Sequence, residues 1–181
     1  MEQILPALGK GFFLIANGNL SDPHFSRTVV LICDHSEKGS YGLVVNQRAG
    51  VPLSKTNSSA LYVGGPCERD RVQVLHRLSS LELGGAEICQ GVAIGGDFTK
   101  ILKTFGSAEV SSSRARFYSG YSGWGAGQLS EEMQRKSWIL CPATAKWIFE
   151  TPVESLWADL LRSMGGYFVF LADMPGDLSV N

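Results

Sequence analysis

The sequence has no uninterrupted apolar run that approaches the roughly 20 residues needed to cross a bilayer. The apolar segment Phe12–Ala16 is too short, and it also lacks the long apolar region and the small-residue cleavage site of a signal peptide. An excess of positive charge is missing as well, because 16 Lys and Arg stand against 17 Asp and Glu, a net charge of −1. No helix-turn-helix pattern or basic stripe is present. We therefore expect a cytoplasmic protein with no membrane segment and no direct DNA binding.

Cysteine is also scarce and shows no paired spacing. The four cysteines form no C-x-x-C pair, and an even count does not by itself indicate a disulfide framework in a chain of 181 residues. We expect reduced thiols at these positions: Cys33, Cys67, Cys89 and Cys141.

The composition that is present is that of a globular protein. Hydrophobic residues make up 44% and charged residues 18%. A chain of this length can bury about 70% of its unfolded surface, so it needs neither disulfides nor a metal to fold. No internal repeat or linker appears, and we expect a single α+β domain over residues 1–181. The 21 glycines indicate many tight turns and close backbone approaches.

Short apolar and β-branched segments predict most of the strands. The polar stretch Gln47–Ala60, with Gly50 and Pro52, is interpreted as a surface loop. The predicted strands are Lys10–Asn17, Thr28–Cys33, Tyr41–Asn46, Arg71–His76, one within Ala86–Ile94, Arg116–Ser122 and Ser137–Cys141.

Helical periodicity predicts three helices. Asp97 is placed to cap a helix that runs over Phe98–Phe105 and ends at Gly106. A second helix over Gln128–Lys136 carries the i,i+4 pairs Glu131–Arg135 and Glu132–Lys136.

The third predicted helix, Thr151–Met164, opens with a capping box and a proline at its first position. Its apolar face includes Leu156, Trp157, Leu160 and Leu161, which we expect to pack against the sheet. The final segment, Tyr167–Asn181, is predicted to contribute a short strand and then fray.

A series of short motifs follows in a fixed order along nearly the whole chain. They are Gly11–Ala16; Asp22-Pro23, Phe25 and Thr28–Val30; Cys33–His35; Gly42–Asn46; Gly64–Pro66 with Val74–His76; Gly120–Trp124 with Gly127–Leu129; and Trp138, Pro142-Ala143, Phe149, Thr151-Pro152 and Trp157. In order and spacing these motifs resemble the AlgH/YqgE family of small bacterial proteins. Asp34 stands where this family usually has Glu, and Ser122 where it usually has Ala.

The resemblance implies a fold but no reaction. The expected fold is α+β, with a mixed, partly bifurcated β-sheet folded toward a barrel and flanked by helices. The family's biochemical function is not established, although the name of one member suggests a role in regulation.

Cys33 and His35 are candidate catalytic residues because they lie two apart at the end of a predicted strand, where their side chains could share one face. A nearby imidazolium would stabilise the reactive thiolate. The alternative is a buried strand cysteine followed by a turn histidine. A metal site built from Cys33, His35, His24 and His76 matches no zinc spacing, so we predict no metal and no cofactor.

The glycine-rich stretch Gly120–Gly127 leads from a strand into a helix, where backbone N–H groups can hold an anion. It matches neither a dinucleotide-binding motif nor a phosphate-binding loop. Ser122 is not a nucleophile elbow either, because Trp124 replaces the second glycine. Gly123, Trp124, Gly127 and Gln128 remain candidates for a small-anion or partner site, and the alternative is a structural turn against which Trp124 packs.

A second candidate groove combines Asn46, Gly64, Gly65 and His76, provided that their strand ends converge. A lone histidine on an alternating strand is more often a structural hydrogen-bonding group than a base.

Two functions therefore remain open. The favoured hypothesis is a non-enzymatic binding or regulatory protein that acts through a protein partner or a small ligand, because no complete catalytic motif is present. The alternative is a thiol-dependent enzyme or redox-responsive protein that uses Cys33 with His35.

Overall fold

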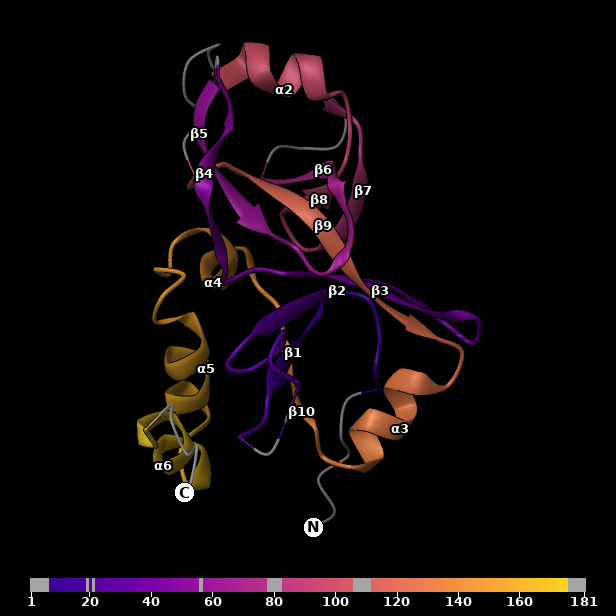
Figure 1. Cartoon of the computed structure of the whole chain (residues 1–181), viewed down its shortest axis with the longest axis vertical. Helices are drawn as coiled ribbons and strands as arrows, with labels where there is room; N and C mark the ends of the chain where they lie inside the picture. Colours follow the sequence, from indigo (N-terminus) through magenta and orange to yellow (C-terminus); the bar gives the residue numbers. More distant parts are fainter. Residues whose placement is uncertain are drawn as a thin grey trace.

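One long strand, β9 (Ala115–Gly125), organises the sheet in the computed structural model, which describes residues 7–18, 20, 22–55, 57–77, 83–105 and 112–175 (Figure 1). The helices are α2 (Phe98–Phe105), α3 (Gln128–Gln134), α4 (Ala145–Phe149), α5 (Leu156–Met164) and α6 (Tyr167–Asp173). The other strands are β1 (Phe12–Ala16), β2 (Val29–Ser36), β3 (Gly39–Val44), β4 (Arg48–Ser54), β5 (Asn57–Val63), β6 (Cys67–His76), β7 (Ala86–Cys89), β8 (Val92–Ile94) and β10 (Trp138–Pro142).

The sheet forks along β9. The main path of hydrogen-bonded strands is β10-β1-β2-β3-β9-β6-β8-β7. β3 pairs with the last residues of β9, from Ser122 to Gly125, whereas β5 pairs in parallel with Phe117–Ser119 on that same edge. β4 in turn pairs with β5. The expected α+β fold with a mixed, bifurcated, curled sheet and flanking helices is therefore confirmed.

The lower half of the sheet is covered on both faces. Residues of β1 and β2 alternate between two cores, so that Phe13 and Leu31 face α4–α6 while Leu14 and Val30 face α3. The helices lie on opposite sides of these strands in Figure 1. Burial on both faces explains why these strands are continuous apolar runs rather than alternating ones.

The predicted apolar face of the penultimate helix is confirmed. Leu156, Trp157, Leu160 and Leu161 are buried, and the Trp157 indole N–H donates to the Ala16 carbonyl at 2.9 Å. The helix nevertheless begins at Leu156, not at Thr151, because residues 151–155 form turns. The N-cap of α5 is Ser155, which makes no side-chain capping hydrogen bond, so the capping box expected at Thr151 was wrong. A side-chain cap is present one helix earlier, where Thr144 accepts from Trp147 N at the start of α4.

Two predictions at the level of elements were wrong. The predicted loop Gln47–Ala60 contains β4 and most of β5, which pair with each other, because β5 finds a further hydrogen-bonding partner in the distant strand β9. The segment after Gly166 forms helix α6, not a strand, and packs against α5 through Leu171 and Ala172.

The other helices agree with prediction more closely. α2 covers the predicted range, and Asp97 Oδ1 accepts from Lys100 N at 3.0 Å; Gly106 lies outside the described residues. Glu131 and Arg135 pair at 3.8 Å, but α3 ends at Gln134 and Glu132 has other partners. No helix in the described part of the chain is long and apolar enough to span a membrane.

Candidate functional site

The structure separates Cys33 from His35. The β2–β3 register shifts between Ile32 and Asp34, so the alternation that places Leu31 and Cys33 in one core does not continue to His35. Cys33 therefore packs into the core beneath α4–α6 and is 5% exposed, whereas His35 Nδ1 hydrogen-bonds Ser40 Oγ at 2.7 Å. Burial raises the pKa of the Cys33 thiol, and Asp34 adds to this effect. Of the two interpretations of Cys33, the structure therefore shows the buried strand cysteine, and no exposed thiol lies beside His35.

The three histidines do not converge on one site. His76 is fully buried at the end of β6, where its Nε2 hydrogen-bonds Gly95 O at 3.1 Å, so it does not share a groove with Asn46. His24 lies in the exposed turn before β2 and contacts Asp22. Within the described ranges, no group of three or more His, Cys, Asp or Glu is arranged to hold a metal ion.

Three glycines form the fork of the sheet. A Cβ on Gly64 would lie 2.4 Å from Gly120 O, and one on Gly65 would lie 2.2 Å from the Tyr121 carbonyl. Gly64 O accepts from Val44 N at 2.8 Å and from the buried Ser122 hydroxyl at 3.2 Å. The predicted convergence of Gly64 and Gly65 with the end of β3 is thus present, and Ser122 has a structural partner.

Asn46 fastens the turn that precedes β2. Its Oδ1 accepts from Val29 N at 2.8 Å, and its Nδ2 donates to Arg27 O at 3.0 Å. Its amide therefore holds backbone rather than a ligand, and this contact places the 22–28 turn beside the fork.

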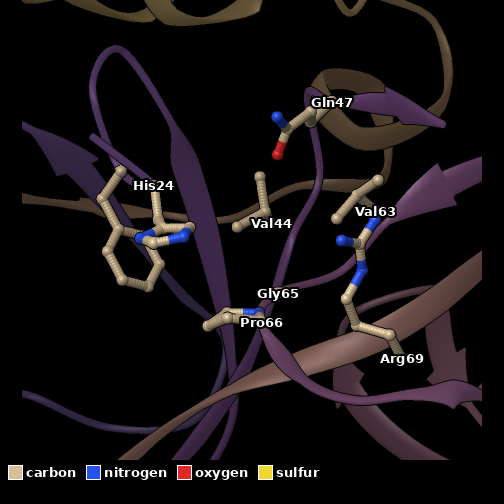
Figure 2. A pocket seen from close by; sticks show the side chains of 8 residues that line it. His24, Val44, Gln47, Val63, Gly65, Pro66 and Arg69 are labelled. Carbon is tan, nitrogen blue, oxygen red and sulfur yellow. The ribbon is translucent and has the colours of Figure 1, made fainter. Parts of the chain in front are cut away.

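The turn, the end of β3 and the fork enclose a pocket of about 270 Å³, here called the junction pocket (Figure 2). Apolar groups form much of its wall, and the polar groups are the His24 imidazole, the Gln47 amide and the Arg69 guanidinium. The lining residues are His24, Phe25, Val44, Gln47, Val63, Gly65, Pro66 and Arg69.

An irregularity in β6 brings Arg69 to this pocket. Cys67 pairs with Tyr121 and Val72 with Ser119, so β6 advances five positions while β9 advances two. The extra residues leave the ladder at Glu68, whose φ is 43°. Ser119 Oγ donates to Arg69 O at 2.5 Å and fixes the backbone there. Among the described residues no carboxylate pairs with the Arg69 guanidinium, which points toward Gln47 and Val63 in Figure 2.

The apolar wall of the pocket is fixed from behind by two tryptophans. Phe25 stacks on Trp124 with ring centroids 6.3 Å apart and meets Trp138 edge-on at 5.6 Å. Both indole N–H groups donate to Glu132 Oε2, at 2.9 Å from Trp124 and 2.7 Å from Trp138. Gln128 Nε2 donates to the other oxygen of Glu132 at 3.1 Å. Trp124 and Gln128, predicted as possible ligand groups, thus support the pocket indirectly.

The glycine-rich stretch is mostly strand rather than turn. β9 continues to Gly125, and only Gly127 of the three glycines Gly123, Gly125 and Gly127 has positive φ, at 75°. Gly127 and His35 border a separate pocket of about 320 Å³ beside α3, as open to solvent as the junction pocket. The predicted residues therefore divide between two places, with Asn46, Gly64 and Gly65 at the fork.

This architecture defines a small α+β protein whose forked sheet holds a pocket at the point of branching. The chain belongs to the AlgH-like family, whose profile matches residues 13–169. A UPF0301 protein of Chlorobaculum tepidum is 34% identical over 174 residues, covering 93% of both chains. A UPF0301 protein of Chlamydia muridarum is 35% identical over 184 residues, covering 96% of both.

Solved structures agree with this membership. The solution structure of AlgH from Pseudomonas aeruginosa superposes with a TM-score of 0.72 at 28% identity, over 98% of this chain and 100% of that one. The crystal structure of DIP2367 from Corynebacterium diphtheriae has a TM-score of 0.74 at 20% identity, over 93% of both chains, and supports the fold alone.

Sequence reasoning missed Arg69, Gln47 and the wall made by Phe25. A signal for Arg69 was present, because the charged run Glu68–Arg71 interrupts the apolar alternation between Pro66 and Val72. Four consecutive charged residues do not suit a strand with a buried face, and a bulge can aim such side chains away from the ladder.

Proposed function

We propose that this protein is a cytoplasmic, non-enzymatic binding protein with a regulatory role, and that the junction pocket takes a small organic anion. The observation that carries the proposal is the Arg69 guanidinium at the pocket, without a carboxylate partner among the described residues. Guanidinium groups bind carboxylates and phosphates through paired hydrogen bonds, so an anionic group is the natural partner.

The apolar wall favours an anion with an apolar body. Phe25, Val44 and Pro66 offer contact surface, while Gln47 and His24 offer further hydrogen bonds. At about 270 Å³ the pocket lies at the small end of ligand sites, which suits a small metabolite better than a large cofactor.

Binding rather than catalysis is supported by what lines the pocket. Its described lining contains one imidazole but no serine, cysteine or lysine that could serve as a nucleophile. The Cys33 thiol, the alternative nucleophile, is buried with a raised pKa. All four cysteines are free, which supports a reducing compartment.

Backbone amide shifts of the ¹⁵N-labelled protein test where such an anion binds. The probes are phenyl phosphate, inorganic phosphate and neutral benzyl alcohol. We expect phenyl phosphate to bind most tightly, with shifts concentrated at residues 24–25, 44–47 and 63–69. Shifts confined to other surfaces, or equal responses to phenyl phosphate and benzyl alcohol, would contradict the proposal.

A further inference from the structure

Arg116 is a buried cation without a matching anion. Arg116 is 4% exposed. Its guanidinium donates to two neutral backbone carbonyls, from Nε to Ser112 O at 3.0 Å and from Nη2 to Phe149 O at 3.3 Å. Nη1 is buried and has no hydrogen-bond partner. A charge removed from water is costly unless an opposite charge and full hydrogen bonding compensate it.

Two buried phenols beside Arg116 also lack an acceptor for their hydroxyl protons. Tyr62 and Tyr118 are register partners on β5 and β9, with ring centroids 5.4 Å apart. The guanidinium groups of Arg48 and Arg116 act on the oxygens of Tyr62 and Tyr118, respectively, but they can only donate. Arg116 Cζ lies 5.3 Å from the centre of the Tyr62 ring. Burial raises the pKa of Tyr118, so its hydroxyl keeps its proton and is available as a donor. Three unused donor groups are thus gathered on one face of the sheet.

The surrounding charges leave one positive charge uncompensated. Arg48 pairs with Glu154 at 2.8 Å, and Arg77 pairs with Glu150 at 2.8 Å. These ion pairs join β4 and the end of β6 to the segment that follows α4. The last residue of α4, Phe149, packs over Arg116, with its ring centre 6.0 Å from Arg116 Cζ. Within the described residues Arg116 forms no ion pair.

We propose that Arg116 Nη1 and the hydroxyls of Tyr62 and Tyr118 bind one small monovalent anion of the halide class in the interior. A single negative charge balances Arg116, and three N–H or O–H donors match the coordination that a halide accepts. A water molecule would accept the same hydrogen bonds but would leave the positive charge of Arg116 uncompensated. Because all three residues are buried, the site excludes anions with an apolar body, and it is independent of the junction pocket.

The test is thermal unfolding in sodium bromide against sodium gluconate at constant ionic strength, because gluconate is too large to enter. In the natural protein, at bromide concentrations above the dissociation constant, each tenfold increase in bromide should raise Tm by about 3–5 °C relative to the Tm in gluconate at the same ionic strength. Arg116→Met should remove this difference. Arg114→Met, which removes an exposed charge from the same end of β9, should keep it.

Tyr118→Phe keeps the test decisive if Arg116→Met does not fold, because it removes one donor and little volume. We expect it to weaken bromide binding about fivefold or more. Crystals of the natural protein grown in bromide should show an anomalous peak within hydrogen-bonding distance of Arg116 Nη1 and Tyr118 Oη. No peak, or a Tm rise that begins at the same bromide concentration in the natural protein and the Tyr118→Phe variant, would overturn the proposal.

Discussion

Gly64 and Gly120 meet backbone to backbone at the fork of the sheet, so closely that a Cβ on Gly64 would lie 2.4 Å from the Gly120 carbonyl oxygen. This contact lets β3 and β5 share one edge of β9, and the junction pocket forms beside it. Two glycines that lie far apart in the sequence thus set the geometry of the site.

Gly64→Ala should destabilise the protein by at least about 2 kcal/mol, because the new methyl group meets backbone atoms that cannot move independently of the sheet. Gly123→Ala is the matched control, since its Cβ would meet only the Tyr121 ring at 3.4 Å and its φ is not in the left-handed region. We expect this control to change stability by less than about 1 kcal/mol. Urea denaturation measures both, and equal losses would show that the close approach is not the cause.

Glu132→Ala should destabilise the protein by about 2–4 kcal/mol, because two largely buried indole N–H groups lose their shared charged acceptor. Glu132→Gln retains an oxygen acceptor and should cost less. Glu131→Ala removes a neighbouring exposed carboxylate, whose pair with Arg135 is a surface one, and should change stability by less than about 1 kcal/mol. If the Glu131→Ala and Glu132→Ala variants unfold at the same urea concentration, the two indole hydrogen bonds to Glu132 contribute nothing to stability.

Cys33 should resist iodoacetamide in the folded protein, because the thiol is buried and its pKa is raised. Cys67 is partly exposed and should react first. Peptide mass spectrometry after timed labelling at neutral pH resolves the sites, and a urea-unfolded sample serves as the reference for full labelling. Fast labelling of Cys33 in the folded state would restore the thiol hypothesis.

The raised pKa of Cys33 should also weaken folding at alkaline pH. Above about pH 8.5 the unfolded thiol loses its proton while the folded one keeps it, so the free energy of unfolding falls as pH rises. Below that pH the Cys33 thiol is protonated in both the folded and the unfolded state, so it adds nothing to the pH dependence of the free energy of unfolding. Cys33→Ala should make the decline shallower by about 1.4 kcal/mol per pH unit between about pH 9 and pH 10. Parallel declines of the two proteins in urea denaturation would contradict this.

The sequence predicted those elements whose signals are local. The apolar runs Phe12–Ala16 and Val29–Cys33 identify strands by themselves, and Asp97 with the apolar spacing of α2 identifies a helix. The β4–β5 hairpin was missed because β4 is mostly exposed and contains a glycine and a proline, and because β5 depends on a distant edge of β9 for pairing. The aromatic, continuously apolar segment of α6 favours a strand locally, but tertiary packing against α5 makes it a helix.

The candidate site was predictable only in part, for reasons of register. The alternation rule placed Cys33 and His35 on one face, and a single bulge in β2 separated them. Gly64 and Gly65 were recognised as a break in the chain, but their contact with Gly120 is long-range and has no local signature. Arg69 reaches the pocket through extra residues in β6 that change the register without interrupting the strand.

The most direct test of the proposed anion site compares Arg69→Gln with Arg71→Gln by calorimetric titration of phenyl phosphate. The two arginines are neighbours in β6, but Arg71 pairs with Glu68 at 2.7 Å whereas Arg69 lines the pocket. Loss of a charge-assisted hydrogen bond predicts that Arg69→Gln weakens binding about 10- to 100-fold. Arg71→Gln should bind like the natural protein. Equal affinities of the natural protein and the Arg69→Gln variant would contradict the assignment of the junction pocket as the anion site.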